Sequence, residues 1–155
     1  LVQAAPERPR VRFYEGIDGL EAMRQDFFGG EIKYELLLIS SADDYHRVAA
    51  LARRLPHAKR MEHTRGFERC IFTSQRPAAE LKKVMPSVER IERFRVPHGE
   101  YPLSGEIAVY GDKVAMLSYH GKVMGVLVES PFLAQTATSL FNLAWQTAKQ
   151  HERFD

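Results

Sequence analysis

The sequence contains a single cysteine, Cys70, and this scarcity excludes an internal disulfide. Cys70 lies in the short apolar run Arg69-Cys70-Ile71-Phe72. No activating partner is identifiable near it, so we expect a buried small hydrophobe rather than a reactive thiol. A chain without a disulfide framework is compatible with the reducing cytoplasm, where we expect this protein to work.

Long hydrophobic runs and an excess of one charge are also missing. No apolar run approaches the roughly 20 residues that span a bilayer, and residues 1–10 lack the apolar core of a signal peptide. Lys plus Arg number 22 and Asp plus Glu 20, a balance that does not predict nucleic-acid binding by charge alone. Residues 1–9, with Pro6 and Pro9, are typical of a linker, so we expect that a further segment preceded them.

The common sequence signatures of metal and nucleotide sites are absent. The six histidines form no His-x-x-x-His pair, and no Cys-x-x-Cys accompanies them, so we predict no metal site. We expect surface and loop side chains instead: His46, His57, His63, His98, His120 and His151. Neither a Gly-x-Gly-x-x-Gly nor a Walker-type loop is present, and the Gly-x-Ser-x-Gly elbow of α/β-hydrolases is missing too. We therefore predict no cofactor.

What is present fits one globular α/β domain of 155 residues. Periodicity and turn residues predict alternating elements in the first part: strands at 10–15, 34–40, 69–73 and within 88–96, and helices at 17–28, 41–55 and 77–84. Strands at 106–110, 113–119 and 123–129 follow, separated by the turns Gly111-Asp112 and His120-Gly121-Lys122.

The last helix begins at the cap Ser130 with Pro131 in its first position. Its predicted apolar stripe consists of Leu133, Ala137, Leu140, Phe141, Ala144 and Ala148. The first half of the chain favours parallel pairing through helical crossovers, and the three late strands favour an antiparallel meander. The predicted fold class is therefore α/β, a mixed β-sheet with helices on both faces.

Two groups of residues are candidate ligand contacts. Glu15, Ser40, Ser41 and Glu129 follow predicted strands, and ligands of open α/β sheets gather beyond the carboxyl ends of the parallel strands. For Ser41 and Ser130 a role as helix cap is the better explanation, and it does not exclude a nearby ligand. A basic cluster forms the second group, a possible anion site that a solvated loop explains better: Arg53, Arg54, Lys59, Arg60, Arg65 and Arg69.

Several segments resemble the effector domain of TrmB-family transcriptional regulators. They are Arg10-Val-Arg-Phe-Tyr-Glu-Gly16 with Ile17-Asp-Gly-Leu20, Ser104-Gly-Glu-Ile-Ala-Val-Tyr-Gly-Asp-Lys-Val-Ala115, Gly125-Val-Leu-Val-Glu-Ser130 and Leu140-Phe-Asn-Leu-Ala-Trp145. The resemblance covers about residues 10–150, in order and at the right spacing, and it is poor over about 55–100. It implies a phospholipase-D-like fold used as a sensor and a homodimer.

The resemblance further implies an N-terminal winged-helix domain, absent from these residues, through which alone DNA would be bound. It implies a sugar effector, although the small added sugar-binding module of some members is missing here. We expect contacts to a sugar or anion from Glu15, Ser40, Ser41, Arg65, Glu106 and Glu129. The dimer face could use Phe141 and Trp145 of the last helix, although core packing is the commoner fate of such aromatic residues.

Enzymes of this fold carry His-x-Lys-x-x-x-x-Asp. His57-Ala-Lys59 and His120-Gly-Lys122 begin that pattern, but Thr64 and Leu127 occupy the acidic position. The likelier counterpart strand, Glu106–Tyr110, has no histidine. We therefore predict a non-catalytic effector and dimerisation domain over 10–150. The alternatives are a diverged phosphodiesterase or hydrolase using His120 or His57, and a ligand-free interaction module.

Overall fold

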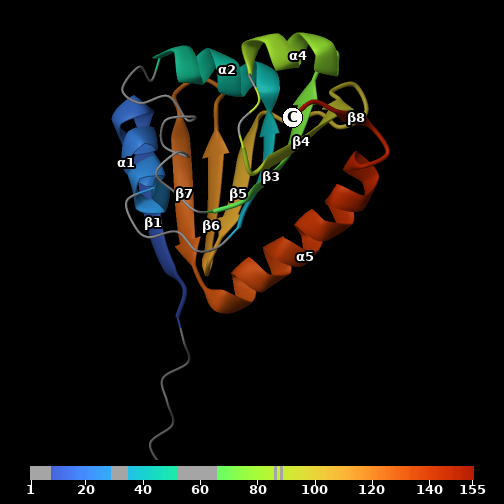
Figure 1. The fold of residues 1–155 in the computed structure, drawn as a ribbon. Coiled ribbons are helices and arrows are strands. Elements are labelled where there is room, and N and C mark those ends of the chain that lie inside the picture. Colours follow the sequence, from blue (N-terminus) through green and yellow to red (C-terminus); the bar gives the residue numbers. More distant parts are fainter. Residues whose placement is uncertain (1–7, 29–34, 52–65, 86, 88) are drawn as a thin grey trace, which may run out of the picture.

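A computed structural model describes residues 8–28, 35–51, 66–85, 87 and 89–155 of the chain (Figure 1). One eight-stranded mixed sheet organises these residues, in the order β1-β7-β6-β5-β2-β3-β4-β8. The strands are β1 (Arg10–Glu15), β2 (Leu36–Ser41), β3 (Glu68–Ser74), β4 (Ile91–Pro97), β5 (Gly105–Tyr110), β6 (Lys113–Ser118), β7 (Met124–Glu129) and β8 (Glu152–Arg153). The helices are α1 (Gly16–Phe28), α2 (Ala42–Leu51), α4 (Ala78–Val84) and α5 (Pro131–Ala148). The predicted α/β class is confirmed, and each predicted element has a counterpart among the described residues. Residues 52–55, the end of the predicted helix 41–55, lie outside them.

The parallel part of the sheet consists of β2, β3 and β4. Leu36, Leu37 and Leu38 are all buried, as expected for a strand covered on both faces. Ser41 is the last residue of β2. Its side-chain oxygen accepts a hydrogen bond from the backbone N–H of Asp44 at 3.3 Å, which confirms its predicted role as the cap of α2.

The antiparallel part is the predicted meander of β5, β6 and β7, which joins β2 through β5. Gly111 and Gly121 lie in its two turns with φ of +53° and +66°, a conformation that glycine adopts without strain. The predicted parallel pairing does not extend to β1. Instead β1 is the outermost strand on one side of the sheet and pairs antiparallel with β7. After α1 the chain enters the centre of the sheet as β2, and not the position beside β1.

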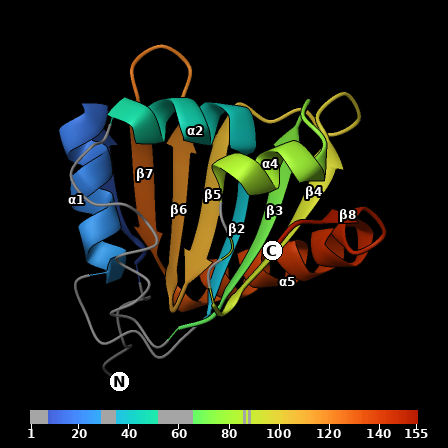
Figure 2. The same cartoon turned by 45° about the horizontal axis from the view of Figure 1, so that its top comes forward.

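The helices cover the two faces of the sheet unequally. Helices α1, α2 and α4 pack on one face, through Leu20, Met23, Ala42, Ala78 and Leu81. Of the helices in the described residues, α5 is the one that packs on the other face, running obliquely from the end of β7 towards β8 (Figures 1 and 2). No helix among the described residues is long and apolar enough to cross a membrane.

Helix α5 begins as predicted, because the Ser130 side chain accepts a hydrogen bond from the backbone N–H of Leu133 at 3.3 Å. Its predicted apolar stripe is only half right. Phe141 and Ala148 are buried, whereas Leu133 and Leu140 are 47% and 62% exposed. The apolar side of this helix is wider than the sheet can cover, and the prediction treated all of it as core.

The segment after α5 has a structural role that the sequence did not indicate. Strand β8 pairs antiparallel with β4. It places Phe154, 2% exposed, in the core beneath α2 and α4, where its ring centroid lies 5.9 Å from that of Phe72. The C-terminal residues therefore complete the core on the face opposite α5.

Candidate functional site

A buried polar cluster lies between the sheet and helices α1 and α2. Ser40 of β2 and Glu106 of β5 are direct partners in the antiparallel register. Their side chains point to the same face, and Ser40 Oγ donates to Glu106 Oε2 at 3.2 Å. The hydroxyl of Tyr119, just beyond β6, donates to the same oxygen at 2.8 Å. The pairing of three strands thus gathers two hydroxyl donors on one carboxylate oxygen.

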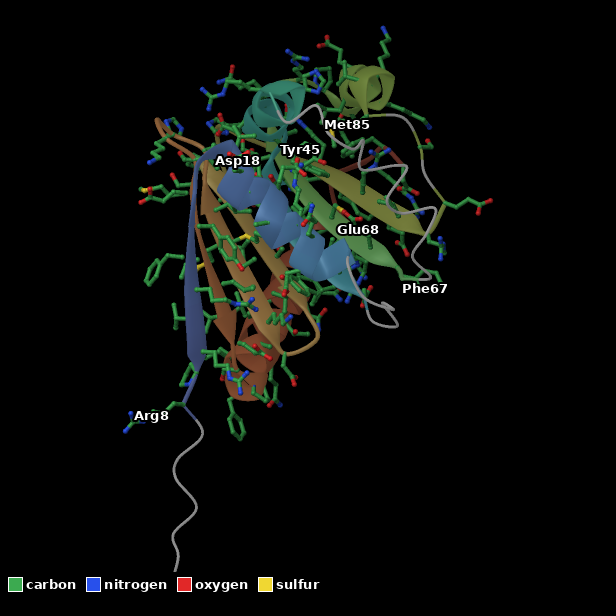
Figure 3. All side chains as sticks on the ribbon, turned by 90° about the vertical axis from the view of Figure 1, so that its left-hand side faces the viewer. Arg8, Asp18, Tyr45, Phe67, Glu68 and Met85 are labelled. Carbon is green, nitrogen blue, oxygen red and sulfur yellow. The ribbon has the colours of Figure 1, made fainter. Side chains whose placement is uncertain are left out.

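The hydroxyl groups of this cluster stay protonated. Burial raises the pKa of Tyr119, and the adjacent Glu106 carboxylate raises it further. Burial also raises the pKa of Tyr45, which α2 places above the same face of the sheet (Figure 3). Both phenols are therefore hydrogen-bond donors at any physiological pH, which suits the binding of polar groups and not nucleophilic attack.

One cation from α1 complements the carboxylates. The guanidinium carbon of Arg24 lies 5.5 Å from the centroid of the Tyr45 ring. Burial alone would lower the pKa of Arg24, but the neighbouring phenols and the carboxylates of Glu106 and Glu21 outweigh it, so its pKa is raised. A permanently charged Arg24 partly balances Glu106 in a region that water reaches poorly.

A second polar group adjoins the first on β3 and β4. Cys70 Sγ lies 3.0 Å from Glu68 Oε1, and burial together with this carboxylate raises the pKa of the thiol well above its usual range. Cys70 is 1% exposed, so the prediction of a buried cysteine is confirmed. Arg93 donates to the carbonyl of Met85 at 2.9 Å, and its guanidinium carbon lies 4.9 Å from the centre of the Phe154 ring.

The space enclosed by these groups is small. A cavity of about 50 Å³ is lined on its polar side by Arg24, Tyr45, Glu68 and Glu106, and elsewhere by apolar side chains of α1 and the sheet. Such a volume holds a few water molecules. In this arrangement of α1, α2 and the sheet, the cavity is too small for a ligand of sugar size.

The other predicted contact residues do not join this cluster. Glu15 lies at the same end of the strands as Ser40, but it belongs to β1, which is four strand spacings, or roughly 19 Å, from β2. Its side chain pairs with Lys122 at 2.8 Å. Glu129 is the last residue of β7, which runs antiparallel to β2. It therefore lies at the opposite end of the strands, beside Arg10 and Ser130. The structure therefore brings Ser40 and Glu106 together but places Glu15 and Glu129 outside this cluster, and ligand contacts by these two residues stay a prediction.

The basic cluster and the His-x-Lys patterns lie elsewhere. The structure does not describe residues 52–65, which include His57 and five members of the basic cluster: Arg53, Arg54, Lys59, Arg60 and Arg65. Arg69 pairs with Glu35 and donates to Asn142 Oδ1 at 3.2 Å. His120 lies in the turn between β6 and β7 with a side chain 66% exposed. Among the described residues, no group of three or more His, Cys, Asp and Glu could hold a metal ion.

Sequence reasoning missed three members of the cluster: Arg24, Tyr45 and Tyr119. Tyr119 carried a usable signal, because alternation along β6 places it two residues beyond Leu117, the partner of Glu106. Arg24 and Tyr45 follow from the packing of α1 and α2, which no strand pattern contains.

Comparisons with known proteins identify the fold. No family model and no curated protein matches the sequence. Among solved structures, TrmBL2, an archaeal chromatin protein with a novel mode of DNA binding, is similar with a TM-score of 0.61 at 13% identity. The match covers 93% of this chain and 53% of that one, so the chain spans about half the length of TrmBL2.

Two members of the phospholipase D group give comparable matches. Nuc from Salmonella typhimurium, described as a phospholipase D family member, has a TM-score of 0.61 at 12% identity, with 95% of this chain and 99% of that chain covered. NucT from Helicobacter pylori has a TM-score of 0.53 at 7% identity, with 93% and 98% covered. The chain therefore has the phospholipase-D-like fold that the resemblance to TrmB-family regulators implies.

Proposed function

We propose that this chain is a regulatory domain that has the phospholipase-D-like fold without its chemistry, senses a small polar ligand and self-associates. DNA would be contacted by a further domain, as in the TrmB-family regulators that the sequence resembles, and residues 1–9 would be the linker to it. The work would take place in the cytoplasm.

The observation that carries this proposal is the hydrogen-bonded position of Glu106. This residue stands on the strand that we matched to the catalytic strand of the enzymes, and it accepts hydrogen bonds from Ser40 and Tyr119. A phosphodiester is an anion, and its reaction needs cationic or donor groups where negative charge develops. A carboxylate at this position repels that substrate.

The same groups favour an uncharged polyhydroxylated ligand such as a sugar. Glu106 can accept hydrogen bonds from ligand hydroxyls, and Tyr119 and Ser40 can donate to them. Tyr45 and Arg24 supply a flat, partly apolar wall for a sugar ring. Because the cavity is only about 50 Å³, binding would displace α1 or α2 and so couple ligand binding to the position of β1, which follows the linker.

Thermal unfolding against a panel of sugars, sugar phosphates, nucleotides and small anions tests the proposal. A ligand that binds only the folded state at 100 times its Kd adds roughly 2.7 kcal/mol of stability. We expect a saturable rise in midpoint with a neutral sugar, lost in Glu106→Gln. The matched control is Glu129→Gln, which changes the same residue type at the opposite edge and should keep the response.

Other outcomes of this experiment separate the alternatives. A response to phosphate-bearing ligands that survives Glu106→Gln would contradict the sensor site. If no ligand of the panel raises the unfolding midpoint, the ligand-free interaction module is favoured. Hydrolysis of a chromogenic phosphodiester, abolished in the double variant His57→Ala/His120→Ala, would establish the diverged phosphodiesterase; we expect no turnover above buffer.

A further inference from the structure

A pocket lies between helix α5 and the sheet, on the face opposite the polar cluster. Its floor is formed near the carboxyl ends of the three parallel strands, by Ile39 of β2, Ile71 and Thr73 of β3 and Val96 of β4. Ligands of open α/β sheets gather at these strand ends. The volume of this pocket, here called the α5 pocket, is about 330 Å³, and small-molecule sites measure roughly 300–1,000 Å³. Its place and its size therefore both suit a small ligand.

Small side chains of α5 leave this space open. Trp145, one of the two aromatic residues that the sequence put forward for a dimer face, is 6% exposed and packs in the core against Phe94 of β4, with 5.1 Å between the ring centroids. The adjacent positions on the helix, Ala144, Thr147 and Ala148, line the α5 pocket. They reach less far towards the sheet than the indole does. Protein interiors contain few voids larger than a water molecule, so an opening of this size beneath a helix is unusual.

The third wall of the α5 pocket is the loop between β4 and β5, residues 98–104. The backbone N–H of Tyr101 donates to the carbonyl of Pro97 at 3.0 Å, which anchors the loop to the end of β4. The ring of Tyr101 also packs edge-on against His151, with centroids 6.1 Å apart, so the loop lies beside the C-terminal end of α5 (Figure 1). Because Tyr101 is 41% exposed, it marks the opening of the pocket to solvent. The residues of this wall are Tyr101, Pro102 and Leu103.

One polar atom of the α5 pocket has no hydrogen-bond partner among the described residues. It is Oγ1 of Thr73, whose side chain is 1% exposed. Alternation along β3 places this side chain on the same face as Ile71, towards the pocket. A buried hydroxyl without a hydrogen bond is costly, and native proteins rarely keep one. Thr73 therefore points to a partner that the described part of the protein does not supply.

The rest of the lining determines the character of that partner. None of the described residues that line the α5 pocket is Asp, Glu, Lys, Arg or His. A charged group moved from water into such surroundings without a counter-charge is strongly disfavoured, so the ligand is neutral. An apolar cavity of roughly 150 Å³ holds benzene. A pocket of about 330 Å³ therefore has room for a ring with substituents.

From these observations we infer that the α5 pocket binds an uncharged, mostly apolar small molecule, a substituted ring with one hydroxyl or carbonyl group that bonds to Thr73. The threonine hydroxyl suits both groups, because it can donate to a carbonyl and accept from a hydroxyl. The inference goes beyond the proposed function, since the α5 pocket lies on the other face of the sheet from Glu106 and takes a ligand of opposite character.

Titration of the isotope-labelled chain with three related probes tests the inference. The probes are para-propylphenol, its hydrocarbon analogue propylbenzene and its charged analogue para-propylbenzoate. In methyl NMR spectra we expect saturable shifts of Ile39, Ile71 and Leu103 with the phenol and with the hydrocarbon, and none with the benzoate. Thr73→Val keeps the shape of the side chain and removes its hydroxyl. It should raise the Kd of the phenol by about tenfold, the amount that one hydrogen bond contributes, and leave that of propylbenzene unchanged.

Two further variants locate the binding. Ala144→Leu places a larger side chain in the α5 pocket and should raise the Kd of both neutral probes by at least about tenfold. Ala137→Leu is the matched control, because it makes the same change two turns earlier on the same side of α5, outside the pocket, and should leave both Kd values unchanged. Glu106→Gln should also leave them unchanged, so this test and the sugar test fail independently.

The thermal midpoint of Thr73→Val is a second measurement on the same variant. If the hydroxyl has no partner in the protein, its removal should leave the midpoint unchanged or raise it. A lower midpoint would show that the hydroxyl is already bonded within the protein, and it would overturn the inference. Absence of shifts with the phenol up to its solubility limit, or equal effects of Ala144→Leu and Ala137→Leu, would overturn it as well.

Discussion

At Glu106, which is half-buried, two hydroxyl groups donate to one carboxylate oxygen. A hydrogen bond to a charged acceptor contributes more to stability than one between neutral groups, and its loss is costly when the acceptor stays buried. The same bonds hold the carboxylate in one position, which a binding site needs. Stability and function therefore depend on the same contacts.

Tyr119→Phe should lower the free energy of unfolding by about 2 kcal/mol, because it removes one donor to Glu106 and adds no volume. Urea unfolding of the two proteins measures this difference. The control is Tyr101→Phe, since the Tyr101 side chain is 41% exposed and its hydroxyl forms no hydrogen bond with the described residues. An equal loss in both variants would contradict the importance of the buried bond.

At the scale of the element, α1 is tied to the sheet by Asp26. Lys113 Nζ lies 2.7 Å and the Tyr110 hydroxyl 3.3 Å from Asp26 Oδ2. Burial acts to raise the pKa of Asp26, but Lys113, Arg12 and Tyr110 outweigh it and hold the pKa below the ordinary 3.8. This contribution to stability is present above pH 3.8, and it is lost as the pH falls through the lower pKa of the folded state.

Asp26→Asn should therefore lower stability by about 1 kcal/mol at neutral pH, and the difference should vanish in acid below the folded-state pKa of Asp26. Urea unfolding at a series of pH values measures it. A double-mutant cycle with Lys113→Met isolates the contact between helix and strand. A difference that is constant down to the acid limit would show that Asp26 acts without its charge.

The C-terminal strand β8 acts through one side chain. Phe154→Ala empties a site that is 2% exposed beside Phe72 and Arg93, and it should cost about 3–4 kcal/mol of unfolding free energy. Phe67→Ala, at an exposed phenylalanine, should change it by less than about 0.5 kcal/mol. A small effect of Phe154→Ala in chemical denaturation would mean that β8 and the residues after it contribute little to the core.

For the whole molecule, the unequal cover of the sheet determines how the chain behaves in solution. Among the described residues, three helices shield the face with the polar cluster, and one uncharged helix shields part of the other. If the chain self-associates as proposed, folding and association are linked, and stability depends on concentration. We expect the Tm to rise by roughly 2 °C for each tenfold increase in protein concentration. Differential scanning calorimetry at several concentrations measures this, and a constant Tm would contradict self-association.

Much of the architecture was predictable from local patterns. The three adjacent leucines of β2, the glycine turns of the meander and the Ser130-Pro131 start of α5 each depend on neighbours in sequence, and all were confirmed. Two of the predicted site residues, Ser40 and Glu106, also meet in the structure. The contact between them follows once β5 lies beside β2 in the predicted sheet.

The sequence by itself determined the elements up to α5, the mixed sheet and the absence of the usual His-x-Lys-x-x-x-x-Asp pattern, because propensity, turns and motifs are properties of short segments. It did not indicate β8. Only the tertiary structure decided which strand ends share an edge, so Glu15 and Glu129 separated from Ser40 while Tyr119 and Arg24 joined it. It also decided which apolar residues of α5 face the sheet, turning Phe141 inward and leaving Leu140 outside. The physical reason is that burial depends on how much surface the neighbouring elements can cover, and the period of a helix does not contain that quantity.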